Sequence, residues 1–125
     1  MYSKIYLIDD VELVNLMHLM MLKKLGLEDM VVSFTNPVKA LNHLRIHEKG
    51  ENPILVLLDI NMPMMDGWEF LDAVDQLGLP KKIAVYITSS SINPLDLKNA
   101  EINPYVRGFM SKPLDPQKLK KLADE

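Results

Sequence analysis

The sequence contains no cysteine, which excludes disulfide bonds, thiolate metal sites and cysteine nucleophiles from its chemistry. It also lacks an uninterrupted apolar run near the ~20 residues that span a bilayer. No secretory signal is predicted, because Asp9, Asp10 and Glu12 fall where its apolar region would have to lie. A net charge of -3 gives no general attraction to nucleic acid or to an anionic membrane. We therefore expect a cytoplasmic protein that binds neither nucleic acid nor membrane.

The composition is that of an ordinary globular protein, since 48% of the 125 residues are hydrophobic and 25% are charged. A chain of this length suits one domain with its own core. The sequence shows no internal repeat, low-complexity tract or linker. We expect residues 1–125 to form a single domain, with no DNA-binding output domain after the last helix.

Short apolar runs alternate five times with longer segments of helical period. The expected strands are residues 4–8, 30–34, 54–58, 83–87 and 106–110. The third run has no polar alternation, which is typical of a central parallel strand that is covered on both faces. Five strands, each followed by a helix, predict an α/β fold: a doubly wound, five-stranded parallel sheet with five flanking helices.

Helix starts are marked by side-chain acceptors. Three of them precede a proline, as Asn36-Pro37, Asn93-Pro94 and Asp115-Pro116. Asp66 with Glu69 has the spacing of a capping box. The first helix, residues 11–25, is apolar on most sides, with a polar ridge of Glu12, Asn15 and His18. We expect its apolar surface to be heavily buried.

Acidic residues follow two of the predicted strands. Asp9 and Asp10 follow the first strand, and Asp59 follows the third. In an open parallel sheet, sites form outside the carboxyl ends of the strands. If these strands are neighbours, three carboxylates share one pocket and repel one another unless a cation relieves them. Oxygen ligands and a few carboxylates suit Mg²⁺.

The same edge of the sheet carries a hydroxyl and an ammonium group. Thr88 ends the fourth strand and is followed by three serines, and Lys112 follows the fifth. A cation and a lysine can neutralise the oxygens of a phosphoryl group while a carboxylate attacks phosphorus. These residue types therefore indicate phosphoryl transfer.

Four motifs occur in order along the chain. They are Ile8-Asp9-Asp10, the run of residues 58–67 (LDINMPMMDG), Ile87-Thr88-Ser89 and the run of residues 108–113 (GFMSKP). Together they resemble the receiver domain of two-component response regulators. The resemblance implies a flavodoxin-like sheet with strand order 2-1-3-4-5.

The resemblance also implies roles for individual residues. Asp59 resembles the phosphoacceptor. Asp10 resembles a direct ligand of Mg²⁺ and Asp9 a ligand through water, while Asp59 and the backbone carbonyl of Asn61 complete the protein ligands. Lys112 resembles the partner of the phosphoryl oxygens, and the peptide bond after it is often cis in this family.

A switch is implied as well. Thr88 resembles the residue that turns to the phosphoryl group, and Phe109 the ring that moves into the vacated space, although many relatives have tyrosine there. This change would reshape the face formed by the fourth helix, fifth strand and fifth helix. The expected partners are a histidine kinase or histidine phosphotransfer protein and an unknown output protein. We expect a monomer or a weak phosphorylation-dependent dimer, and no enzyme beyond its own phosphorylation and dephosphorylation.

Alternatives remain open on the sequence alone. A Mg²⁺-dependent phosphatase with an aspartyl nucleophile would need an acid two residues after Asp59, where Asn61 stands. A flavodoxin-like cofactor carrier would need a phosphate-binding loop where Asp9 and Asp10 lie. A receiver that no longer takes phosphate, or one that is part of a longer regulator, is a further possibility.

Two histidines have a spacing that metal sites use. His43 and His47 are four residues apart on the second predicted helix, a spacing that can bind zinc. The sequence shows no third ligand beside them, so it does not predict a metal site there.

Overall fold

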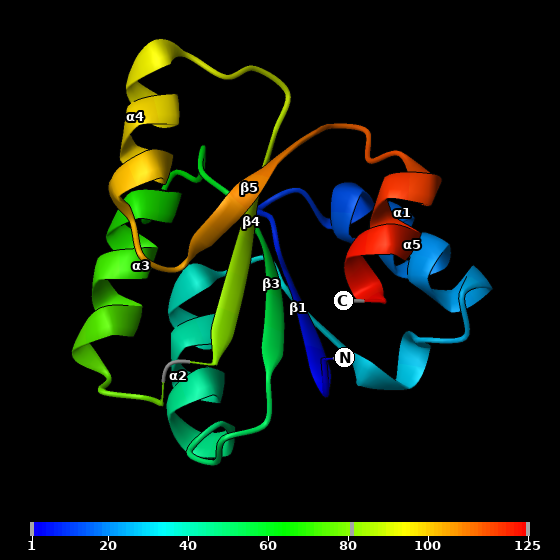
Figure 1. The fold of residues 1–125 in the computed structure, drawn as a ribbon, viewed down its shortest axis with the longest axis horizontal. Helices are drawn as coiled ribbons and strands as arrows, with labels where there is room; N and C mark the ends of the chain where they lie inside the picture. The colour runs from blue at the N-terminus through cyan, green and yellow to red at the C-terminus, as the bar shows by residue number, and fades with distance from the viewer. Residues whose placement is uncertain (1, 81, 125) are drawn as a thin grey trace.

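The computed structural model describes residues 2–80 and 82–124, which form a five-stranded parallel sheet in the order β2-β1-β3-β4-β5 (Figure 1). The strands are β1 (Lys4–Ile8), β2 (Val31–Phe34), β3 (Ile54–Asp59), β4 (Ile83–Ser89) and β5 (Val106–Ser111). The helices are α1 (Glu12–Lys24), α2 (Pro37–His47), α3 (Gly67–Gln76), α4 (Pro94–Ile102) and α5 (Pro116–Ala123), with a 3₁₀ turn, η1 (Glu28–Met30). The predicted fold class and strand order are confirmed.

The core consists of two layers of apolar side chains, one on each face of the sheet. All six residues of β3 are buried, as its unbroken apolar run predicts for a central strand. On one face the strands pack against α2 and α3, through Leu44, Phe70 and Val74. On the other face they pack against α1 and α5, through Leu22 and Leu119. Figure 1 shows α1 and α5 on one side of the sheet and α2, α3 and α4 on the other.

The predicted caps fix where the helices begin. The side chain of Asn36 accepts a hydrogen bond from the amide of Val38 at 2.9 Å, at the start of α2. Asp66 and Glu69 form the reciprocal capping box of α3, with bonds of 2.8 and 3.0 Å. Asn93 and Asp115 cap α4 and α5 in the same way. These side chains satisfy amides that have no partner within the helix.

Three strands continue further than the sequence predicts. β3 ends at Asp59, β4 at Ser89 and β5 at Ser111, because each ladder continues through paired polar residues such as Asp59 opposite Thr88. At the other end of the sheet, Met30 belongs to the turn η1, so β2 begins one residue later than expected. The predicted phosphoacceptor therefore lies within a strand.

The prediction for α1 was wrong. Its buried residues are Asn15, His18 and Leu22, whereas Leu13 and Met20 expose 64% and 56% of their surface. The cause is a polar contact, because the amide nitrogen of Asn15 donates to the carbonyl oxygens of Asp9, just after β1, and of Phe34, the last residue of β2, each at 3.0 Å. Asn15 and His18 of the polar ridge thus face the sheet with Leu22, whereas Glu12 and much of the apolar surface face outward.

Within the described residues, no helix has both the length and the apolar character needed to cross a bilayer.

Candidate functional site

Three carboxylates converge at the carboxyl edge of the sheet. Asp9 and Asp10 follow β1, and Asp59 ends β3, which is the neighbour of β1. One carboxylate oxygen from each residue lies within 4.8 Å of the other two. The prediction that these strand ends bring the acids together is confirmed. Asp9 and Asp59 are buried, so water screens their mutual repulsion poorly.

Lys112 brings a positive charge into this group. Its Nζ lies 2.5 Å from Oδ2 of Asp9 and 3.4 Å from Oδ1 of Asp59. The backbone amide of Lys112 donates to the carbonyl of Ser89 at 2.9 Å, which holds the residue beside the end of β4. The Lys112–Pro113 peptide bond is cis, as the resemblance implies. One ammonium group therefore contacts two of the three carboxylates.

The surroundings of Asp59 shift its protonation. Burial raises the pKa of Asp59 to about 6, with a smaller contribution in the same direction from Asp9. The backbone amide of Asn61, which donates to Oδ1 of Asp59 at 3.1 Å, and the charge of Lys112 act in the opposite direction. The side chain is still mostly ionised at pH 7, and the positive charge around it does not fully compensate for burial and for repulsion from Asp9.

The donor set fits a hard divalent cation. Three carboxylates whose oxygens lie within 4.8 Å of one another offer oxygen ligands and no nitrogen or sulfur. Mg²⁺ prefers such ligands and keeps several of its waters. Asp10, the most exposed of the three, faces the open side of the group, where water can complete the coordination.

Thr88 and Phe109 lie on the strands next to Asp59. Thr88 is paired with Asp59 across the ladder between β3 and β4, and it is buried. Phe109 is half-buried on β5, opposite Ile87, and packs against the core at its edge. The threonine that the sequence singles out is thus adjacent to the acid, and the phenylalanine lies one strand further out.

The loop after Asp59 is held by a close approach at Gly67. Its amide donates to the carbonyl of Ile60 at 3.1 Å. A Cβ atom at Gly67 would lie 2.7 Å from Cγ2 and 2.8 Å from Cα of Ile60, which no side chain permits. Glycine is therefore required where the loop closes beside the site.

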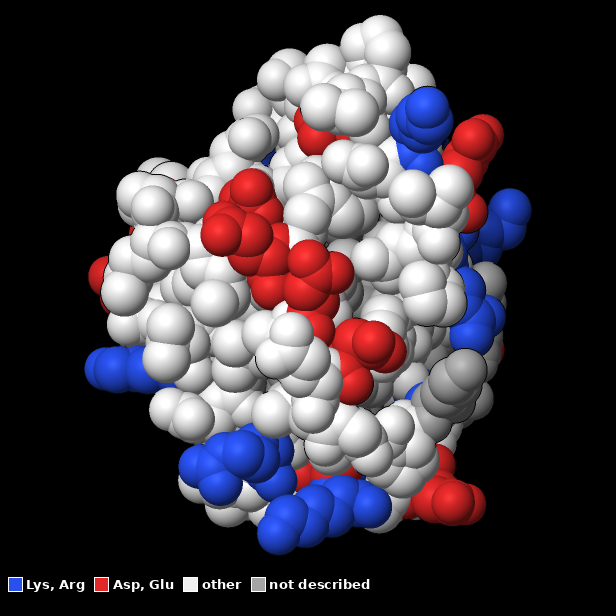
Figure 2. Space-filling view, turned by 90° about the vertical axis from the view of Figure 1, so that its left-hand side faces the viewer, with Lys and Arg blue, Asp and Glu red and all other residues white. Residues whose placement is uncertain are grey.

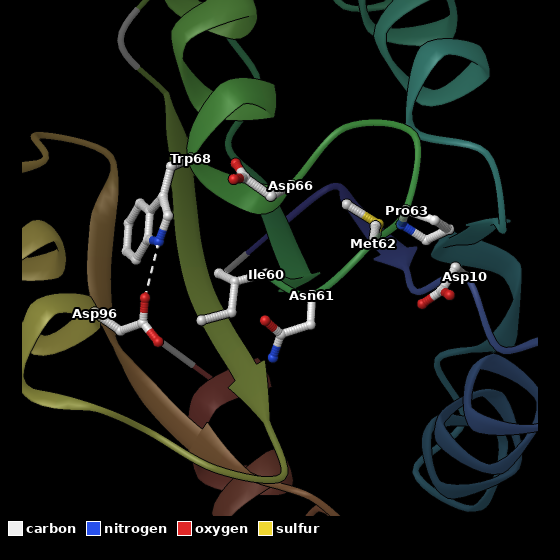
Figure 3. Close-up of a pocket in the computed structure, with 8 residues that line it drawn as sticks. All are labelled: Asp10, Ile60, Asn61, Met62, Pro63, Asp66, Trp68 and Asp96. Carbon is white, nitrogen blue, oxygen red and sulfur yellow. Dashed lines mark hydrogen bonds between the residues drawn. The ribbon is translucent and has the colours of Figure 1, made fainter.

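An open pocket of about 550 Å³ leads to the acidic group. Asp10 lies at one end of the pocket, Trp68 and Asp96 lie at the other, and Asn61 lies between them (Figure 3). The indole nitrogen of Trp68 donates to Asp96 at 3.2 Å, a contact that joins α3 to α4 at one end of the pocket. Acidic side chains also gather in a band on the face that carries these helices (Figure 2). This charge favours cations at the entrance.

Two residues near the site are not predicted from the sequence. Asn15 is 3% exposed and bonds to the carbonyl of Asp9, so it positions the backbone that carries the acid pair. His18 is buried one turn further along α1, and burial lowers the pKa of its imidazole. The sequence pattern shows both only as part of a polar ridge. No local signal separates a polar ridge that faces water from one that faces strand ends.

Comparison with known proteins identifies the family. The sequence model of the response regulator receiver domain matches residues 5–124. The chain belongs to this family. Receiver domains are phosphoacceptor switches of two-component signalling and bind Mg²⁺ through an acidic pocket, and the group formed by Asp9, Asp10 and Asp59 corresponds to such a pocket. Membership favours the switch over the phosphatase and the cofactor carrier.

Several known proteins are similar to most of this chain. A probable methanogenesis regulatory protein, FilR2, of Methanothrix harundinacea is 31% identical over 82% of this chain and 67% of its own length. The two-component response regulator ORR1 of rice is 33% identical over 74% of this chain, but this match spans only 42% of the rice protein. The crystal structure of a two component response regulator from Cytophaga hutchinsonii is 33% identical, with a TM-score of 0.81 over 97% of this chain and 93% of that one.

Proposed function

We propose that Asp59 accepts the phosphoryl group, from a phosphohistidine of a histidine kinase or phosphotransfer protein. The observation that carries the proposal is the convergence of Asp9, Asp10 and Asp59, the first and last of which also contact Lys112. A carboxylate oxygen of Asp59 forms a bond to phosphorus, the bond from phosphorus to the imidazole nitrogen breaks, and its electron pair stays on the imidazole. The match to residues 5–124 supports one receiver domain over residues 1–125.

Asp10, Asp59 and the backbone carbonyl of Asn61 would hold Mg²⁺ directly, and Asp9 would hold it through water. When bound, the ion neutralises charge on the transferred phosphoryl group. Lys112 contacts another of its oxygens, which its 3.4 Å distance from Asp59 supports. The amide of Asn61 fixes the orientation of the attacking carboxylate.

Phosphorylation then changes the face formed by α4, β5 and α5. Thr88 turns its hydroxyl to the phosphoryl group, and the ring of Phe109 moves into the space that Thr88 leaves. Phe109 lines two surface grooves, one of about 360 Å³ beside α4 and one of about 470 Å³ beside α5. Moving this ring alters both grooves at once. α4 contributes no buried residue of its own, so its position is weakly held. The reshaped face binds the output protein.

Labelling with acetyl phosphate in Mg²⁺ tests the assignment of the acceptor. We expect the wild-type protein to gain one phosphoryl group by intact-mass spectrometry, with the label on the peptide that contains Asp59. Asp59→Asn removes the nucleophile and abolishes labelling. Asp72→Asn, the same exchange at an exposed position of α3, leaves labelling unchanged. Stoichiometric labelling of Asp59→Asn would contradict the proposal.

A further inference from the structure

A second group of ionisable side chains lies toward the C-terminal end of α2, away from the three aspartates. His43 and His47 are one turn apart on this helix, and their ring centroids are 4.3 Å apart with 37° between the ring planes. His43 is half-buried and His47 is exposed. Two imidazoles at this spacing on a helix can direct one nitrogen each to a common point.

A buried hydrogen-bonded chain fixes the proton on His43. The hydroxyl of Tyr6 donates to Oε2 of Glu48 at 2.9 Å and lies 2.7 Å from Nδ1 of His43. A hydroxyl has only one hydrogen to donate. Tyr6 donates it to the carboxylate of Glu48, which can only accept. The contact to His43 is then a donation from its Nδ1–H to the oxygen of Tyr6. His43 therefore carries its proton on Nδ1, and Nε2 keeps its lone pair.

This arrangement has the form of a metal-binding histidine. Metal-binding histidines commonly donate their second ring nitrogen to a carboxylate or another acceptor, which sets the tautomer and the orientation of the ring. Here the hydroxyl of Tyr6 connects His43 to the carboxylate of Glu48. The ring of Phe34, 5.3 Å from that of His43, packs beside the imidazole. Burial, together with His47, lowers the pKa of His43, so its imidazole is neutral at pH 7.

The position on the helix also favours a cation. His47 is the last residue of α2 and Glu48 caps it, so the pair lies at the end where carbonyl groups carry partial negative charge. The two lysines nearby both contact Glu48, and the charge of Lys4 also helps to lower the pKa of His43. Nζ of Lys4 lies 3.7 Å from Glu48, and Lys82 donates to the carbonyl of Glu48 at 2.8 Å.

We propose that His43 and His47 bind one divalent transition-metal cation of the Zn²⁺ or Cu²⁺ class, through Nε2 of His43 and a ring nitrogen of His47. Imidazole ligands select such ions over Mg²⁺, which the carboxylates at the opposite edge of the sheet suit. Within the part of the chain that the structure describes, the three aspartates are the only cluster of three acidic or histidine ligands. Water therefore fills the remaining positions of the ion. This site is separate from the phosphorylation site and does not depend on it.

Calorimetric titration with Zn²⁺ in excess Mg²⁺ tests the proposal, because Mg²⁺ occupies the acidic pocket. We expect one equivalent of Zn²⁺ to bind the wild-type protein. His47→Gln, at an exposed position, weakens binding by about 100-fold, since it removes one of two linked ligands. Asp59→Asn is the matched control and leaves Zn²⁺ binding unchanged. Loss of binding in Asp59→Asn with retention in His47→Gln would overturn the proposal.

The role of Tyr6 has its own readout. Long-range ¹H–¹⁵N spectra of the imidazoles report which ring nitrogen carries the proton. We expect the Nδ1–H form of His43 in the wild-type protein, and Zn²⁺ to shift Nε2 of His43 and a ring nitrogen of His47. Tyr6→Phe removes the acceptor of Nδ1–H, mixes the tautomers and weakens Zn²⁺ binding by about tenfold. Ring signals that do not respond to Zn²⁺ would exclude the site.

Discussion

Two of the buried carboxylates, Asp59 and Glu48, lie at opposite ends of the molecule, and their surroundings differ in kind. Asp59 and Glu48 expose only 4% and 5% of their surface. Glu48 accepts a hydrogen bond from the hydroxyl of Tyr6 at 2.9 Å and lies 3.7 Å from the ammonium of Lys4. Asp59 accepts a hydrogen bond from a backbone amide, but it shares the charge of Lys112 with Asp9 and lies beside a third carboxylate, that of Asp10.

This difference indicates that Glu48 stabilises the fold, whereas Asp59 is available for a reaction. A buried charge costs stability unless hydrogen bonds and an opposite charge satisfy it. The partners of Glu48 meet this demand, and they join β1 to the end of α2. The group around Asp59 keeps an excess of negative charge, which a divalent cation relieves. Variants at the two ends test this contrast, from the largest expected effect to the smallest.

Removing the carboxylate of Glu48 destabilises the protein. Glu48→Ala leaves the buried hydroxyl of Tyr6 without its acceptor, and we expect the free energy of unfolding to fall by about 2–3 kcal/mol. Urea denaturation at pH 7 measures it. Glu51→Ala, at an exposed position nearby, is the control and changes stability by less than about 0.5 kcal/mol. If the two variants were equally stable, Glu48 would not hold β1 and α2 together.

Removing the charge of Asp59 should instead raise the free energy of unfolding. Asp59→Asn relieves burial of the charge and repulsion from Asp9, the causes that raise the pKa of Asp59 to about 6. A shift of this size corresponds to at most about 3 kcal/mol, which the solvent at the open pocket screens to about 1–2 kcal/mol. We expect Asp59→Asn to be more stable than the wild-type protein by this amount at pH 7 without Mg²⁺.

The pH dependence of that gain follows from linkage. The native state holds the proton of Asp59 more tightly than the unfolded chain, whose pKa is near 3.8. The stabilisation of the wild type by this proton is complete below about pH 4 and is lost as the pH rises through about 6. The advantage of Asp59→Asn therefore grows between pH 4 and 6. Urea denaturation across this range measures it, and a difference that does not vary with pH would mean that the charge of Asp59 is not its origin.

Mg²⁺ should reduce the difference in stability between Asp59→Asn and the wild-type protein. At ten times its dissociation constant, the ion adds about 1.4 kcal/mol to the stability of the wild-type protein, and chelation with EDTA removes it. We expect Asp59→Asn to gain less, because a ligand is missing, and Glu48→Gln to gain as much as the wild type. A thermal shift measured with and without Mg²⁺ compares them. An equal gain in wild type and Asp59→Asn would place the ion elsewhere.

The sequence predicts the acidic end better than the opposite end, for a physical reason. Asp59 and Lys112 are separated by more than fifty residues, yet both follow apolar strands, and parallel strands bring their carboxyl ends to one edge. The caps at Asn36 and Asp66 are predictable because they act within a few residues. Strand order and residue roles come from the family resemblance, since neither periodicity nor spacing determines them.

The network of Glu48 has no comparable signal. Tyr6 lies within an apolar strand, and Glu48 follows a helix, where an acid is usually exposed. The contact between them joins residues 42 positions apart and depends on how α2 packs on the sheet. The same limit applies to α1, where the bonds from Asn15 to two strand ends reverse the expected faces of the helix.

The smallest expected effect concerns Trp68, whose fluorescence should respond to the acidic pocket and not to the histidine pair. Trp68, the one tryptophan of the sequence, lines the same pocket as Asp10 and donates to Asp96 at 3.2 Å. Asp96→Ala removes this half-exposed bond and lowers stability by about 0.5 kcal/mol. We expect Mg²⁺ to change the fluorescence of Trp68 because the ion alters the charge of the pocket.

The matched control is Asp75→Ala, which removes a second contact of α3, with the hydroxyl of Tyr105, and leaves Trp68 in place. It should respond to Mg²⁺ as the wild type does, whereas Asp96→Ala should show a different amplitude. Zn²⁺ added in excess Mg²⁺ should leave the signal unchanged, because His43 and His47 lie at the other end of α2. A Zn²⁺ response that His47→Gln abolishes would mean that the two ends are coupled through the sheet, and their charges could then no longer be treated as independent.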